Sequence, residues 1–124
     1  MIRNHYPELF EDDTEFLELT NDVASRTYEF TEYVNRLMRE GTYKVDISTR
    51  DSEDIPKVTY HEACHLSRDL GVKEGPRNIL RALEGLEFVE MSKPEVCCGF
   101  GGVFSIKFAN ISSAMMMEKV DSIE

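Results

Sequence analysis

The chain has 124 residues, with 14 Lys or Arg against 24 Asp or Glu and a net charge of −10. This length fits a single domain. The acidity argues against a nucleic-acid partner, because phosphate binding depends on clustered Lys and Arg. No apolar run in the sequence approaches the roughly 20 residues that a membrane helix requires, so we expect no membrane span. The N-terminus also lacks the apolar stretch of a signal peptide.

The first half of the chain is the more acidic one. Residues 1–55 contain 6 basic and 14 acidic residues, a net charge of −8. Apolar side chains recur at steps of three, four or seven from Phe16 to Leu37. This spacing predicts one helix over about residues 14–40 that tolerates a break near Asn21 and Asp22.

A linker is expected after this helix. Gly41 is placed to end the helix in a left-handed conformation. Residues 41–56 are polar and rich in turn formers, so they predict a linker with at most a short strand near residues 43–47.

From residue 57 the pattern alternates between strands and helices. Short strands are predicted over residues 57–60 and 86–91, which are rich in β-branched and aromatic residues. Pro76 fits the first turn of one helix, and a last helix is predicted over residues 111–120 with Asn110 as its N-cap. This order predicts an α/β fold: a small, mostly parallel sheet with flanking helices, preceded by a long N-terminal helix.

The cysteines follow the two predicted strands. Only three are present, so a complete internal disulfide framework is excluded, and a disulfide between the neighbours Cys97 and Cys98 would close a strained ring. Three cysteines without a complete disulfide framework favour a location in the reducing cytoplasm, where cysteines more often serve metal or redox chemistry. Loops beyond the carboxyl ends of parallel strands meet at one edge of the sheet, so we expect Cys64 to face the pair.

Thiolates are the preferred ligands of iron–sulfur clusters and zinc. The three glycines that follow the pair would let the backbone approach a cluster and donate N–H groups to its sulfur atoms: Gly99, Gly101 and Gly102.

Residues 61–65 match the HExxH pattern of zinc proteases, in which two His share a helical face and the Glu acts as a base. Here the motif follows a predicted strand and does not open an amphipathic helix, which weakens that interpretation. His65 is instead a candidate donor beside the thiolates.

Three segments resemble a known family. YHEACHL, GVKEGPRNILRALEGLEFVEM and CCGFGGVFSIK are similar to the cysteine-rich CCG domain, which occurs in heterodisulfide reductase and in the iron–sulfur subunits of glycolate oxidase and L-lactate utilisation. These segments are most similar to the sequences of the lactate-utilisation branch of the family. By this resemblance, residues 1–55 form an acidic helical linker segment and residues 56–124 a truncated CCG module.

The resemblance implies a ligand set. Family modules carry one cysteine, then an adjacent pair, then a Cys-x-x-Cys, which here would lie beyond residue 124. Cys64 corresponds to the first and the pair to Cys97 and Cys98. The implied cofactor of the full-length protein is an iron–sulfur cluster of the 4Fe-4S type, non-cubane in characterised members. For this fragment two outcomes stay open: no bound metal, or zinc held by three thiolates and His65.

The resemblance also implies a function. The chain would be a fragment of the iron–sulfur subunit of a cytoplasmic oxidoreductase that oxidises L-lactate to pyruvate, with glycolate as the other candidate substrate. Electrons would pass through the cluster to other subunits of a lactate-utilisation complex, and the fragment alone would be inactive. The alternatives are a non-catalytic subunit-interaction module, whose acidic helix docks a partner, and, more weakly, a zinc hydrolase built on residues 61–65.

Overall fold

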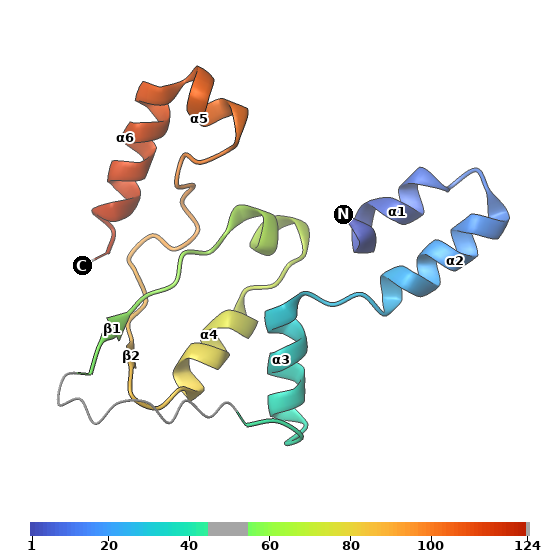
Figure 1. Ribbon diagram of the computed structural model, residues 1–124, viewed down its shortest axis with the longest axis horizontal. Helices are drawn as coiled ribbons and strands as arrows, with labels where there is room; N and C mark the ends of the chain where they lie inside the picture. Colours follow the sequence, from blue (N-terminus) through green and yellow to red (C-terminus); the bar gives the residue numbers. More distant parts are fainter. Residues whose placement is uncertain (45–54, 124) are drawn as a thin grey trace.

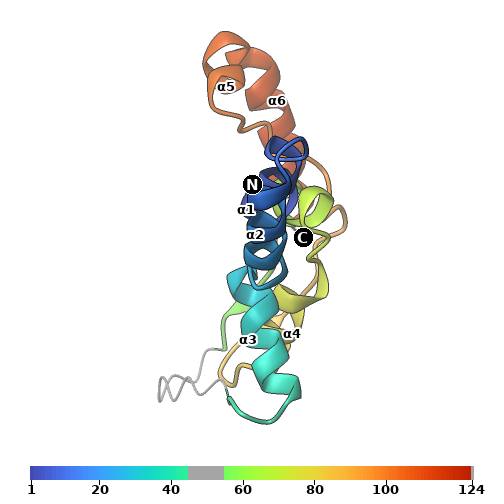
Figure 2. The ribbon, with the colours of Figure 1, turned by 90° about the vertical axis from the view of Figure 1, so that its right-hand side faces the viewer.

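The computed structural model describes residues 1–44 and 55–123. Its helices and strands spread out in the plane of Figure 1 and form a thin slab when seen from the side in Figure 2. The elements follow in the order α1 (Ile2–Leu9), α2 (Thr14–Ser25), α3 (Phe30–Arg39), β1 (Lys57–Val58), the π-helix η1 (His65–Asp69), α4 (Glu74–Ala82), β2 (Glu87–Phe88), α5 (Val103–Lys107) and α6 (Ala109–Val120).

The predicted α/β class is confirmed by a small parallel sheet. Lys57 of β1 pairs with Glu87 of β2, and Val58 pairs with Phe88. Both strands are shorter than predicted, since beyond them the chain turns into the loops that carry the cysteines. Helix α4 packs against β2 and against α3, so one helical layer flanks the sheet.

The single helix expected over residues 14–40 is wrong: the structure has two helices, α2 and α3, separated by residues 26–29. The break lies after the predicted position. Glu29 explains it, because its carboxylate accepts hydrogen bonds from Thr31 N at 2.7 Å and Glu32 N at 3.1 Å. Capping of this kind starts a new helix. The left-handed end at Gly41 is confirmed, with φ at 71°.

Three helical segments lie outside the predicted set: α1, η1 and α5. Helix α1 packs against α2 as a hairpin, and Asn4 Nδ2 ties α1 to the Asp69 carbonyl oxygen at 2.6 Å. Helix α5 precedes α6, which begins at Ala109 and so makes Asn110 a helical residue, not the expected N-cap. The short strand expected near residues 43–47 lies largely outside the described residues.

The interior of the described part is more polar than apolar. Its buried hydrophobic residues are Ala24, Val72 and Met91, whereas six polar or charged residues are buried. Five of those six lie around the cysteine-bearing loops: Glu62, Ser67, Arg77, Lys119 and Ser122. In residues 1–44 and 55–123 no helix has the combined length and apolarity needed to cross a membrane.

Candidate functional site

The two cysteine-bearing segments leave neighbouring strands at the same end of the sheet. The loop after β1 leads to Cys64, and the loop after β2 leads to Cys97 and Cys98. The two loops touch, because the Glu62 N–H donates to the Pro94 carbonyl at 3.1 Å. Figure 1 shows the segment before η1 running beside the segment that follows β2. The expectation that these segments meet at one sheet edge is therefore confirmed.

The three thiols are all free and differ in accessibility. Cys64 is exposed, whereas Cys97 and Cys98 are half-buried. Cys97 Sγ accepts a hydrogen bond from Gly99 N at 3.5 Å, which is the kind of backbone donation that stabilises a ligating sulfur.

The two loops meet through Glu62 and Pro94, but their three thiols do not form a coordination group in the described residues. In the described residues no three His, Cys, Asp or Glu side chains are gathered closely enough to hold a metal ion. His65 is exposed and lies 3.5 Å from Asp69 Oδ2 through its Nε2 atom. The donor chemistry of three free thiols, two of them in a glycine-rich loop, is the chemistry that an iron–sulfur cluster requires.

The glycines of the second loop have different roles. Gly99 is buried with φ at 79°, and a Cβ atom there would lie 2.5 Å from the Ser112 carbonyl oxygen. Gly102 also has a positive φ of 51°, whereas a Cβ at Gly101 would make only an ordinary contact of 3.6 Å. Close approach to a helix thus requires glycine at position 99.

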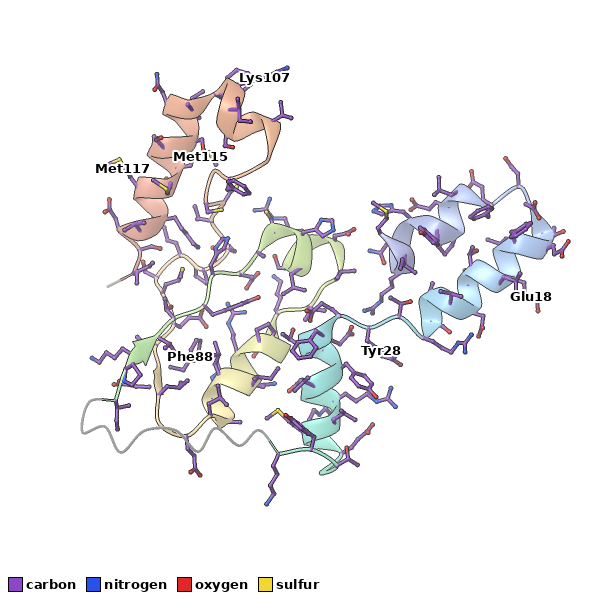
Figure 3. The ribbon with its side chains drawn as sticks, in the orientation of Figure 1. Glu18, Tyr28, Phe88, Lys107, Met115 and Met117 are labelled. Atoms are coloured by element: carbon purple, nitrogen blue, oxygen red, sulfur yellow. The ribbon has the colours of Figure 1, made fainter. Side chains whose placement is uncertain are left out.

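Side chains near both ends of helix α6 donate hydrogen bonds to the loop that carries Cys97 and Cys98, which we call the cysteine loop. Toward its start, Ser112 Oγ donates to the Gly99 carbonyl at 2.9 Å. Toward its end, Lys119 Nζ donates to the carbonyl oxygens of Lys93 at 2.5 Å and Pro94 at 2.8 Å. Figure 3 shows Met115 on the side of α6 nearer this loop and Met117 on the outer side, and Met117 is accordingly exposed.

The buried guanidinium group of Arg77 binds the loop that leads to Cys64, through Glu62. Arg77 of α4 binds both carboxylate oxygens of Glu90, with Nε at 2.6 Å and Nη2 at 3.1 Å. Its Nη2 atom also lies 3.0 Å from Glu62 Oε2, its Nη1 atom donates to the Lys73 carbonyl at 2.8 Å, and it stacks over the Tyr60 ring at 5.3 Å. Arg77 therefore joins the exits of β1 and β2.

These contacts shift the ionisation of both partners. The hydrogen bond to Glu90 is the main reason why the pKa of Arg77 is raised. Burial works against the charged form of Glu62, but the hydrogen bond from Arg77 and the charge of Lys73 outweigh it, so the pKa of Glu62 is lowered. Both groups are charged at neutral pH.

His61 has a different environment. Its Nδ1 atom is buried and has no hydrogen-bond partner in the described part of the chain. Burial, together with the nearby charge of Lys119, lowers the pKa of His61. The ring is therefore neutral at pH 7.

The HExxH pattern does not form the geometry of a zinc protease. His61 precedes η1, which begins at His65, so the two His do not share a helical face. Glu62 is buried in its ion pair with Arg77 and does not stand free as a general base. This arrangement favours a structural role for Glu62.

Sequence reasoning missed the two residues that hold the loops, Arg77 and Lys119. Lys119 lies on α6, which has no distinct apolar face, whereas Arg77 lies on the apolar face of α4, three residues before Leu80. A cation on such a face is a signal of burial that helical periodicity can reveal.

Comparison with known proteins places these residues in a family. A family model of the cysteine-rich domain CCG matches residues 58–124. Lactate utilization protein A 1 of Bacillus anthracis (strain CDC 684 / NRRL 3495) is 38% identical over 124 residues, covering 100% of this chain and 48% of the relative. Lactate utilization protein A of Lysinibacillus sphaericus (strain C3-41) is 40% identical over 119 residues, covering 96% and 49%.

The chain thus spans about half the length of the curated relatives it matches. No solved structure matches it.

Proposed function

Because this chain belongs to the family of cysteine-rich CCG domains, we propose that it is part of the iron–sulfur subunit of a lactate-utilisation oxidoreductase. The observation that carries the proposal is the meeting of two loops with three free thiols at one sheet edge. The names of the relatives add lactate as the substrate class.

The proposed ligands are the thiolates of Cys64, Cys97 and Cys98. His65 is a further candidate donor, and Gly99, Gly101 and Gly102 would allow the backbone to approach the bound group. A 4Fe-4S cluster would supply one-electron transfer when bound. The protein would supply burial, hydrogen bonds to sulfur and a fixed loop geometry.

The proposed overall reaction is the oxidation of L-lactate to pyruvate. It releases two electrons and two protons, and the electrons would pass to partner subunits of the complex. A cytoplasmic location agrees with three unpaired thiols. Residues 1–55 are proposed as the acidic helical segment and residues 56–124 as the CCG module.

Anaerobic reconstitution of the full-length protein with iron and sulfide tests the proposal, because this chain spans about half the length of its relatives and carries three of the five family cysteines. We expect bound iron, acid-labile sulfide and a visible charge-transfer band, each lost in the Cys64→Ser, Cys97→Ser and Cys98→Ser variants. Met117→Ser is the matched control, because it removes an exposed sulfur from α6 and should leave iron binding unchanged.

Two results would contradict the proposal: no iron bound by the full-length protein that contains this chain, or equal iron binding in its three cysteine variants. The alternative of a non-catalytic interaction module makes a different prediction. In that case the triple cysteine variant would bind partner subunits as the parent chain does.

A further inference from the structure

Lys119 is a buried cation with an unusual set of partners. The residue is only 5% exposed, and its ammonium group donates to two consecutive main-chain carbonyls, those of Lys93 and Pro94. No ion pair joins it to a carboxylate in the described part of the chain, although the neighbouring Lys93 pairs with Glu118 at 2.9 Å. A buried charge without an opposite charge is costly.

The carbonyls that Lys119 binds belong to the cysteine loop. Lys93 O also accepts from Val96 N at 3.4 Å, so Lys119 secures the turn that immediately precedes Cys97. Pro94 O also accepts from Glu62 N at 3.1 Å. One ammonium group therefore fixes the approach to the cysteine pair and its contact with the loop of Cys64.

The end of α6 adds a second attachment of the same segment. Ser92 N donates to the Ser122 carbonyl at 3.2 Å, and Ser122 Oγ donates to the Lys119 carbonyl at 2.7 Å. The main chain around Lys119 is thereby fixed, so the position of its ammonium group is set by the helix and not by a flexible side chain alone.

We propose that Lys119 is a positioning residue of the cysteine loop: its buried ammonium group fixes the segment that presents Cys97 and Cys98, and its positive charge favours a negatively charged group bound to their thiolates. The second part rests on the proposed function. The bound group would then supply the counter-charge that no carboxylate of residues 1–44 and 55–123 gives Lys119, since clusters held by several thiolates carry net negative charge.

Three variants separate these roles. Lys119→Met keeps a side chain of similar length but loses the charge and the donors. It leaves Lys93 O and Pro94 O with their remaining backbone donors, so the fold should survive. Lys119→Arg keeps the charge and the donors and should rescue the loss. Lys93→Met is the matched control, because it removes one positive charge from the same loop at an exposed position.

The first measurement needs no cluster. Each variant is alkylated with N-ethylmaleimide under reducing conditions, and the rates at Cys97 and Cys98 are followed by peptide mass spectrometry. We expect Lys119→Met to react about tenfold faster than the parent chain, equivalent to about 1.4 kcal/mol of lost loop fixation. Lys119→Arg and Lys93→Met should stay close to the parent rate. Exposed Cys64 serves as an internal standard.

The second measurement uses the full-length protein that contains this chain, reconstituted with iron and sulfide. A nearby positive charge stabilises the reduced, more negative form, so Lys119→Met should shift the midpoint potential to more negative values. Lys119→Arg should restore it, and Lys93→Met should have little effect.

The outcomes distinguish the two proposals. If the full-length protein binds no iron, the proposed function fails, and the alkylation rates alone decide the positioning role. Alkylation rates that are equal in the parent and Lys119→Met chains, or equally raised in Lys93→Met, would overturn the role of Lys119. An unchanged potential in Lys119→Met would overturn the charge effect.

Discussion

At the scale of single residues, Arg77 is the side chain on which the site depends most for its stability. It is 6% exposed and pairs with Glu62, which is itself buried, as well as with Glu90. Removing one partner of a buried ion pair leaves an uncompensated charge in the interior, which typically costs about 3–5 kcal/mol. We therefore expect Arg77→Met to lower the free energy of unfolding by about this amount.

Urea unfolding followed by circular dichroism measures this cost. Arg81→Met is the control, because Arg81 lies on the same helix but is half exposed, with Glu74 as its partner at 3.6 Å. Its loss should cost no more than about 1 kcal/mol. Arg77→Lys keeps the charge, so its loss in the free energy of unfolding should lie between those of the two Met variants. If Arg77→Met and Arg81→Met lower the free energy of unfolding by equal amounts, the buried ion pair adds no more stability than the exposed one.

At the scale of elements, the contact between the cysteine loop and α6 depends on Gly99. A side chain there would be strained at φ of 79° and would meet the Ser112 carbonyl at 2.5 Å. A left-handed backbone alone costs a side chain about 1–2 kcal/mol. We expect Gly99→Ala to separate the loop from α6, with faster alkylation of Cys97 and Cys98 and a lower melting temperature.

Gly101→Ala is the matched control for this variant. It lies in the same loop, and its Cβ would meet Phe104 at an ordinary 3.6 Å. Alkylation rates and melting temperatures should therefore stay close to those of the parent chain. If both alanine variants behave alike, the loop does not depend on its close approach to α6.

The elements also show what the sequence could predict. The parallel pairing of β1 and β2 and the meeting of the two cysteine loops follow from strand–helix alternation, which is a local pattern. The break between α2 and α3 is harder to place, because Phe30 follows Val23 by seven residues and so keeps the helical spacing across the break. The capping by Glu29 also depends on its side-chain conformation. The role of Lys119 escapes a local pattern because its partners are main-chain carbonyls 25 and 26 residues away.

At the scale of the whole molecule, stability should depend on pH through His61. Its pKa is lowered in the folded state by burial and by Lys119, whereas in the unfolded chain it lies near about 6.5. The unfolded state therefore binds a proton first as the pH falls below about 6.5, and this favours unfolding. We expect the urea concentration at the unfolding midpoint to decrease as the pH is lowered from about 7.5 to about 5.5.

Two variants test this assignment. His61→Gln should flatten the decline over that range, whereas His65→Gln, which replaces an exposed ring, should retain it. Glu62 adds a loss of stability only at lower pH, because its lowered pKa places its protonation below the ordinary value of 4.5. A decline of the same size in the parent and both variants would contradict the role of His61.

The attachment of the cysteine loop to α6 has a consequence for biosynthesis. The bonds from Lys119 to Lys93 and from Ser92 to Ser122 span 26 and 30 residues, and contacts of such separation form after local ones. Cys97 and Cys98 leave the ribosome before Lys119 does. The neighbouring thiols therefore pass through a period in which nothing fixes their geometry.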